Sequence, residues 1–278
     1  MKPLRDISAV FNRLRHARRK ALIPFIMGGD PNLSTTAQLI GTLAGAGADL
    51  IEVGIPFSDP LADGPTIQRA SSRALAAGAT PAAVLHMIAR VKSRVPIVVL
   101  SYWNPVVQFG GASAKPWRSR ADNPVPFFRE AARCGVSGLI VPDLPPDEAD
   151  GLHAIGRRHG LATIFLAAPT SPPNRLRQIA RASEGFIYYL SLTGTTGARR
   201  HLPTEWLHGV RQLKLLTTKP ICVGFGISTA AQARAVSRAA DGVIVGSALI
   251  RALEPYGGQR RRVLREAASF IHRLRRAV

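Results

Sequence analysis

The chain has few cysteines, few aromatic residues and no long apolar run. Cys134 and Cys222 are its two cysteines among 278 residues. Two cysteines are too few for a disulfide-rich secreted scaffold and are typical of a reducing compartment, so we expect a cytoplasmic protein. No stretch approaches the ~20 apolar residues that span a bilayer, and the N-terminal segment does not read as a secretory signal. No Cys/His spacing typical of a metal site is present, so no metal and no membrane contact are expected.

Acidic residues are also scarce, because 17 Asp and Glu stand against 37 Lys and Arg, a net charge of +20. An excess of this size is typical of nucleic-acid-binding proteins. More than half of it lies in residues 1–20 and 251–278. Aromatic residues, at 6%, are not interleaved with these basic runs, which argues against a surface that stacks single-stranded nucleic acid. We favour a solvated basic surface without a specific nucleic-acid partner, and keep a basic nucleic-acid-binding barrel as an alternative.

Hydrophobic residues make up 46% of the chain, which is enough for a substantial core. Short β-branched apolar runs recur, nearly continuous rather than alternating, as is typical of strands buried on both faces. Amphipathic stretches between them predict helices. The expected strands are 21–29, 50–56, 97–103, 138–143, 163–168, 185–191, 220–226 and 241–246, and the expected helices are 33–46, 66–77, 81–93, 126–134, 146–159, 173–182, 204–216, 228–239 and 260–276.

Eight strands alternating with helices favour a single (β/α)8 TIM barrel over residues 1–278, an α/β fold with extra N- and C-terminal helices. No GxGxxG follows the first strand, which weighs against a dinucleotide-binding fold. Residues 110–126 interrupt the alternation, because they are polar, basic and too long for an ordinary βα loop. We expect a loop insertion after the third strand. A lid, a partner contact and a disordered excursion all remain open for it.

Active sites of such barrels lie at the carboxyl ends of the strands, and carboxylates occur at the end of the second one. Glu52 lies inside the apolar run, where an ionised side chain is costly unless it is paired or functional. Burial would raise its pKa toward the range useful for proton transfer. Asp63 follows eleven positions later and can face the same cavity. A buried Arg or backbone donors could instead satisfy Glu52, and Asp63 could simply cap the helix expected from Thr66.

Three glycine-rich segments follow the last three strands: GTTG (194–197), GFGIS (224–228) and VGSAL (245–249). Glycines let backbone N–H groups approach an anion, and helix N-termini favour negative charge. Phosphate sites after strands 7 and 8 recur in this fold. The sequence therefore predicts a phosphorylated small-molecule substrate. No Lys lies within a strand core, which disfavours Schiff-base chemistry.

Seven segments resemble the tryptophan synthase alpha chain family. The most specific is IEVGIPFSDPLADGPTIQRA (51–70), and the others are PFIMGGDP (24–31), SYWNPV (101–106), GVSGLIVPDLPPDE (135–148), YYLSLTGTTG (188–197), PICVGFGIS (220–228) and DGVIVGSALI (241–250). The resemblance covers about residues 20–250. It implies a lyase of tryptophan biosynthesis that cleaves indole-3-glycerol phosphate to indole and glyceraldehyde 3-phosphate by a retro-aldol reaction, as the alpha subunit of tryptophan synthase.

The same resemblance implies roles for individual residues. Glu52 would be the main acid and base, and Asp63 would accept a hydrogen bond from the indole N–H. The residues implied to contact the rest of the substrate are Phe25, Ile67, Leu100, Tyr102, Tyr188 and Thr196. Those implied to hold the phosphate are Gly197, Phe225, Gly226, Ile227, Gly246 and Ser247.

A partner is implied as well. In the family, the alpha chain pairs with a beta subunit that carries pyridoxal phosphate (PLP), so we expect an α2β2 heterotetramer and no cofactor in this chain. Asp59 and Pro60 after the second strand, and Asn104 and Pro105 after the third, lie where the family meets its partner. A stand-alone indole-3-glycerol-phosphate lyase is the near alternative. Another phosphosugar enzyme, such as an isomerase, shares the phosphate site, but the segment 51–70 argues against it.

Overall fold

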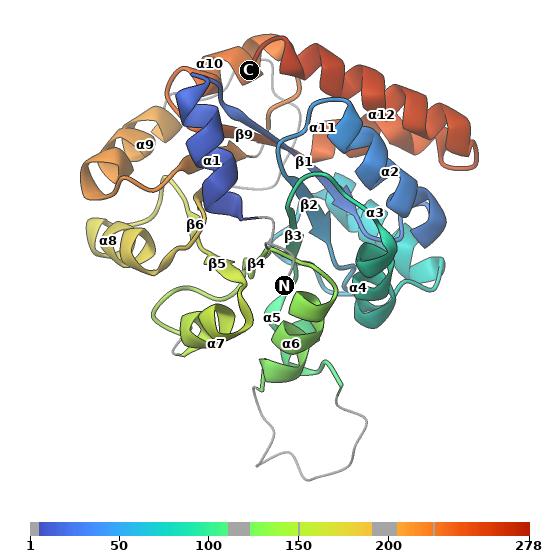
Figure 1. Cartoon of the computed structure of the whole chain (residues 1–278), viewed down its shortest axis with the longest axis horizontal. Coiled ribbons are helices and arrows are strands. Elements are labelled where there is room, and N and C mark those ends of the chain that lie inside the picture. Colours follow the sequence, from blue (N-terminus) through green and yellow to red (C-terminus); the bar gives the residue numbers. More distant parts are fainter. Residues whose placement is uncertain (1–5, 111–122, 150, 191–204, 225) are drawn as a thin grey trace.

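A parallel β-barrel ringed by helices makes up the computed structural model, which describes residues 6–110, 123–149, 151–190, 205–224 and 226–278 (Figure 1). The strands are β1 (Ala21–Met27), β2 (Ile51–Gly54), β3 (Ile97–Leu100), β4 (Gly138–Ile140), β5 (Ala162–Ile164), β6 (Leu166–Ala167), β7 (Ile187–Leu190), β8 (Ile221–Gly224) and β9 (Gly242–Val245). Every strand pairing is parallel. This arrangement confirms the expected (β/α)8 class.

The helices fall mainly between consecutive strands. They are α1 (Ile7–His16), α2 (Leu33–Gly45), α3 (Pro65–Ala76), α4 (Pro81–Arg90), α5 (Trp103–Val107), α6 (Val125–Arg133), α7 (Leu152–His159), α8 (Pro173–Ala182), α9 (Glu205–Leu216), α10 (Ala230–Ser237), α11 (Ser247–Leu253), the short 3₁₀ turn η2 (Glu254–Tyr256) and α12 (Arg260–Arg275). Because parallel neighbours need a crossover, the helices between two strands return the chain to the start of the next strand. The loops that follow the strands therefore gather at one end of the barrel.

The barrel closes through a break in the fifth expected strand. The sheet order β5-β4-β3-β2-β1-β9-β8-β7-β6 begins and ends with two segments that only Phe165 separates. At this point the chain changes its pairing partner from β4 to β7, and the Phe165 carbonyl accepts a hydrogen bond from the Tyr188 N–H at 3.1 Å. The expected single strand 163–168 is therefore wrong in detail. Nine short segments occupy the eight positions of the barrel.

Boundaries of strands and helices also differ from expectation, most clearly after β3 and before α7. The run 97–103 was expected to be strand throughout, but β3 ends at Leu100 and Trp103 begins α5. The Asp143 carboxylate accepts the Trp103 N–H at 2.9 and 3.1 Å, which satisfies a donor that the start of a helix leaves free. The helix expected from residue 146 begins only at Leu152. Most of the insertion expected at 110–126 lies outside the described residues.

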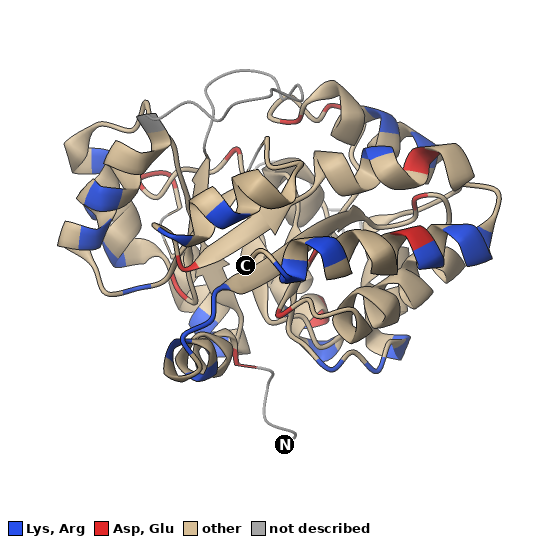
Figure 2. Ribbon diagram, turned by 90° about the horizontal axis from the view of Figure 1, so that it is seen from above, with Lys and Arg blue, Asp and Glu red and all other residues tan. Residues whose placement is uncertain are grey.

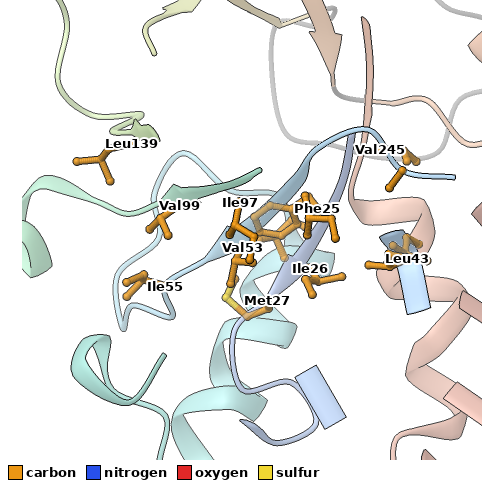
Figure 3. Packing of buried hydrophobic residues seen from close by; sticks show 14 of the residues in the cluster. Phe25, Ile26, Met27, Leu43, Val53, Ile55, Ile97, Val99, Leu139 and Val245 are labelled. Atoms are coloured by element: carbon orange, nitrogen blue, oxygen red, sulfur yellow. The ribbon is translucent and has the colours of Figure 1, made fainter. Parts of the chain in front are cut away.

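Apolar side chains pack in two layers, one on the outer and one on the inner face of the barrel sheet. One layer lies between the strands and the outer helices, where Ile26, Val53 and Leu43 pack (Figure 3). The other fills the barrel interior and ends against α1, whose Phe11 ring lies 5.9 Å from that of Phe186. Helix α1 thus covers the end where the strands begin. A ligand must enter from the opposite end, where the strands finish.

Basic residues lie mainly on the solvent sides of amphipathic helices. Helix α12 buries Val263, Ala267, Phe270, Ile271 and Leu274, and most of its arginines lie on the other face. Figure 2 shows Lys and Arg on outer helices on both sides of the barrel and on α1. This distribution fits the solvated surface expected from the sequence. In the part of the chain that the structure describes, no helix combines the length and apolar character that a membrane span requires.

Candidate active site

A pocket opens where the strands end, and most of the predicted site residues line it. Its walls come from strands or loops of both halves of the barrel. The lining residues are Phe25, Glu52, Asp63, Ile67, Leu100, Tyr188, Gly226, Ile227, Ile244, Gly246, Ser247, Ala248 and Arg251. Residues as far apart in sequence as Phe25 and Arg251 therefore meet in one cavity, because parallel strands place all their carboxyl ends together. Thr196, Gly197 and Phe225 lie outside the described residues.

Glu52 is a buried carboxyl group in the middle of β2. Its side chain is 1% exposed, and neither carboxylate oxygen has a hydrogen-bond partner among the described residues. The alternative of a structural Glu52, satisfied by a buried Arg or by backbone donors, finds no support in this part of the chain. Burial is the larger cause, and the nearby negative charge of Asp63 the smaller one, that together raise the pKa of Glu52 to about 8. At neutral pH this side chain therefore carries a proton that it can donate.

Asp63 reaches the same pocket from the loop between β2 and α3. The N-cap of α3 is Gly64, so the interpretation of Asp63 as a helix cap is wrong. Its carboxylate instead accepts a hydrogen bond from the Tyr102 hydroxyl at 3.1 Å, and that hydroxyl also accepts the Ala62 N–H at 3.0 Å. Burial raises the pKa of Asp63 to about 6, although the Tyr102 hydrogen bond acts in the opposite direction. Asp63 is thus ionised at neutral pH while Glu52 is protonated.

Tyr188 closes the pocket beside the two carboxyl groups. It lies in β7 with 5% of its surface exposed, and burial together with the charge of Glu52 raises its pKa well above the usual value. A Cβ atom on Gly224 would lie 2.6 Å from the Tyr188 hydroxyl oxygen, so the absence of a side chain there leaves room for the phenol. Phe25, Ile67 and Leu100 supply apolar wall. Tyr102 lies behind Asp63 and does not line the pocket itself.

The remaining side of the pocket is suited to an anion. Gly226 has φ +80°, a conformation that L side chains rarely adopt. Gly246 directly precedes α11, which begins at Ser247. Backbone N–H groups at such turns can point at a negatively charged group. Within the described residues, no group of three or more His, Cys, Asp or Glu side chains could hold a metal ion.

Three lining residues were missed from the sequence. Ile244 lies two positions before Gly246 in β9, so the strand alternation could have placed it on the same face. Ala248 follows Ser247 directly. Arg251 lies four positions after Ser247 in α11, and the helical period could have identified it.

The buried carboxyl groups make stability depend on pH. The pKa of Glu52 is about 8 in the folded protein against an ordinary value of 4.5. Between these values the folded chain holds a proton that the unfolded chain has released, so the free energy of unfolding falls as pH rises. We expect Glu52→Gln, which stays neutral, to have a higher melting temperature than the wild type at about pH 9 and a similar one at about pH 5. Circular-dichroism melts at both pH values test this, and an equal difference at both would contradict it.

Comparisons with known proteins agree with this geometry. The family model described as "Tryptophan synthase alpha chain" matches residues 11–278. Two proteins named tryptophan synthase alpha chain, from Geobacter sulfurreducens and Gloeobacter violaceus, are 45% and 47% identical in sequence to this chain. The alignments cover 98% of this chain and 98% and 94% of theirs.

Solved structures show the same relationship in three dimensions. A chain from a structure of Mycobacterium tuberculosis tryptophan synthase superposes with a TM-score of 0.86 at 37% identity, covering 98% of this chain and 97% of that one. Tryptophan synthase subunit alpha from Legionella pneumophila gives 0.85 at 35% identity, with coverage of 98% and 97%. Because these matches run over nearly the whole chain, the protein belongs to the tryptophan synthase alpha chain family, enzyme subunits of tryptophan biosynthesis.

Proposed function

We propose that the chain cleaves indole-3-glycerol phosphate to indole and glyceraldehyde 3-phosphate by a retro-aldol reaction. One observation carries this proposal. Two carboxyl groups share a pocket, and the pKa values of about 8 for Glu52 and about 6 for Asp63 leave one protonated and the other ionised at neutral pH. Paired groups whose environments separate their pKa values in this way are suited to divided acid and base roles.

In the first step, protonated Glu52 donates its proton to C3 of the indole ring. This breaks the aromaticity of the five-membered ring and leaves a positive charge centred on the indole nitrogen. The ionised Asp63 carboxylate accepts the N–H hydrogen bond and stabilises that charge. In a site closed to water such electrostatic stabilisation is much stronger than in solution.

In the second step, Glu52, now a carboxylate, removes the proton from the hydroxyl group on C3′ of the glycerol chain. The bond between C3 and C3′ then breaks. Its electron pair returns to the ring and restores the aromatic indole, while the C3′ oxygen becomes the carbonyl of glyceraldehyde 3-phosphate. Glu52 ends protonated as it began, so no external acid or oxidant is needed.

The other pocket residues bind the substrate in this proposal. Phe25, Ile67, Leu100 and Tyr188 enclose the indole ring, and Tyr102 holds Asp63 through its hydroxyl group. The phosphate is bound by the glycine-rich loops. Those residues are Gly197, Phe225, Gly226, Ile227, Gly246 and Ser247, with Thr196 next to them.

We further infer a beta-subunit partner, in an α2β2 assembly in which PLP belongs to the partner. The loop after β2 supports this, because its tip is exposed and carries Leu61, which has 91% of its surface accessible. Asp59 and Pro60 directly precede Leu61, and Asn104 and Pro105 lie after β3, the strand next to β2. A cytoplasmic location and one barrel domain over residues 1–278, with 110–126 as an insertion, complete the proposal.

The test is product formation from indole-3-glycerol phosphate by the purified chain, with indole and glyceraldehyde 3-phosphate measured separately. We expect equal amounts of both, released slowly by the chain alone and much faster after a beta subunit is added. Fast release that the beta subunit leaves unchanged would identify a stand-alone lyase. No release under either condition would overturn the proposed reaction.

A further inference from the structure

Arg251 is the cationic residue in the lining of the pocket, as far as the described residues show. It lies in α11 and is partly buried. The other ionisable lining residues are the acids Glu52 and Asp63 and the phenol Tyr188. A single arginine in a pocket with two carboxyl groups calls for a physical explanation, because it is not needed for the proton transfers derived above.

Arg251 lies in the last turn of α11, on the helix face that also carries Ser247 of the candidate phosphate site. Ser247 and Arg251 are four residues apart, so their side chains lie on the same face of the helix. Each Cα–Cβ bond of a helix is tilted toward the helix N-terminus, and long side chains cover the preceding turn. This general geometry directs a long side chain at position 251 toward Gly246 and Ser247, and all three residues line the same pocket.

The charge of Arg251 is also available to a ligand. Two other arginines of this region are already paired: Arg69 with Glu254 at 3.2 Å, and Arg73 with Glu254 and Asp30, each at 2.7 Å. No described carboxylate forms an ion pair with Arg251, although Glu254 lies only three positions further along the chain. Glu254 and Asp30 are thus already paired with Arg69 and Arg73, and among the described residues Arg251 is the pocket-lining residue that carries a positive charge.

A phosphate monoester carries a charge of about −1.5 to −2 at neutral pH, and ionised Asp63 in the same pocket repels it. Backbone N–H groups at Gly226, Gly246 and Ser247 supply only partial positive charge. We propose that Arg251 binds the substrate phosphate through its guanidinium group and offsets this repulsion. The identity of the phosphorylated substrate rests on the proposed function, whereas the contact itself requires only that the pocket take a phosphate ester.

Binding of glycerol 3-phosphate, measured by titration calorimetry, tests the contact without catalysis. Arg251→Gln is expected to weaken binding about tenfold or more, as is typical when a charged hydrogen-bond donor is lost. Arg251→Lys, which keeps the charge, should retain most of the affinity. Arg234→Gln, on the exposed side of α10, is the matched control and should bind like the wild type. Equal affinity of the wild type and Arg251→Gln, or no binding by the wild type, would overturn the proposal.

Kinetics of the reverse reaction separate this inference from the proposed function. With indole and glyceraldehyde 3-phosphate as substrates, Arg251→Gln should raise KM for the phosphorylated substrate about tenfold and leave KM for indole unchanged. A merely structural role would move both values. If the wild type shows no reaction but Arg251→Gln still weakens glycerol 3-phosphate binding, the proposed reaction fails and the phosphate contact stands. If the wild type reacts and both KM values are unaffected, the contact is wrong and the reaction stands.

Discussion

Glu52→Gln is expected to lower the rate of indole release from indole-3-glycerol phosphate by at least about 10³-fold, because general acid and base steps typically contribute about 10² to 10⁴ each. Glutamine keeps the size of the side chain, but it cannot donate a proton to C3 or remove one from the C3′ hydroxyl. The wild-type carboxyl group is 1% exposed, so water cannot readily take over its role. Single-turnover assays with the purified variant measure the loss.

The fold must be intact for this result to be informative. Glu52 accepts no hydrogen bond from described residues, so its amide replacement breaks no contact there. We expect unchanged binding of glycerol 3-phosphate and an unchanged far-ultraviolet spectrum. Glu266→Gln, a carboxyl change on the outer helix α12, serves as the matched control and should keep full activity. Near-normal activity of Glu52→Gln would refute the assigned mechanism.

Asp63→Asn is expected to lower the same rate by about 10² to 10³, the usual loss when a group that stabilises transition-state charge is removed. An asparagine carbonyl can still accept the indole N–H, but it lacks the negative charge that offsets the cation formed on C3 protonation. The loss should therefore fall mainly on kcat, with KM changed little. Steady-state kinetics with indole-3-glycerol phosphate separate the two parameters.

The matched control for Asp63→Asn is Asp147→Asn. Asp147 lies in an exposed ion pair with Arg175 at 3.0 Å, far along the chain from the loop after β2. Exposed pairs of this kind contribute little to stability, so this variant should have wild-type kinetics. If Asp63→Asn raised KM alone and left kcat intact, Asp63 would bind the substrate without stabilising the cation.

The sequence allowed the fold class and the two carboxyl groups to be predicted because both depend on local patterns. Continuous apolar runs indicate strands buried on both faces, and the fold then places the residues that follow each run at one end of the barrel. Glu52 was recognisable since a carboxyl group within such a run conflicts with burial. Gly226, Gly246 and Ser247 followed from turn chemistry at the ends of β8 and β9.

Features that depend on contacts between distant segments could not be predicted in this way. The hydrogen bond from Tyr102 to Asp63 joins two loops 39 positions apart, and only the structure shows that it replaces a helix cap. The split at Phe165 reflects a change of pairing partner, which leaves no local signature. The spacing of Arg251 from Ser247 is visible in the sequence, but only the structure shows that Arg251 lines the pocket.

The pH dependence of kcat/KM for indole release tests the division of roles between the two carboxyl groups most directly. Asp63 must be ionised and Glu52 protonated, so the rate should rise through about pH 6 and fall above about pH 8. The fall in rate above about pH 8 is the decisive part of the profile. The rise through about pH 6 overlaps the second ionisation of the substrate phosphate, which also occurs near pH 6. A tenfold fall for each pH unit above about 8 supports proton donation by Glu52. A rate that stays constant up to about pH 10 would contradict it.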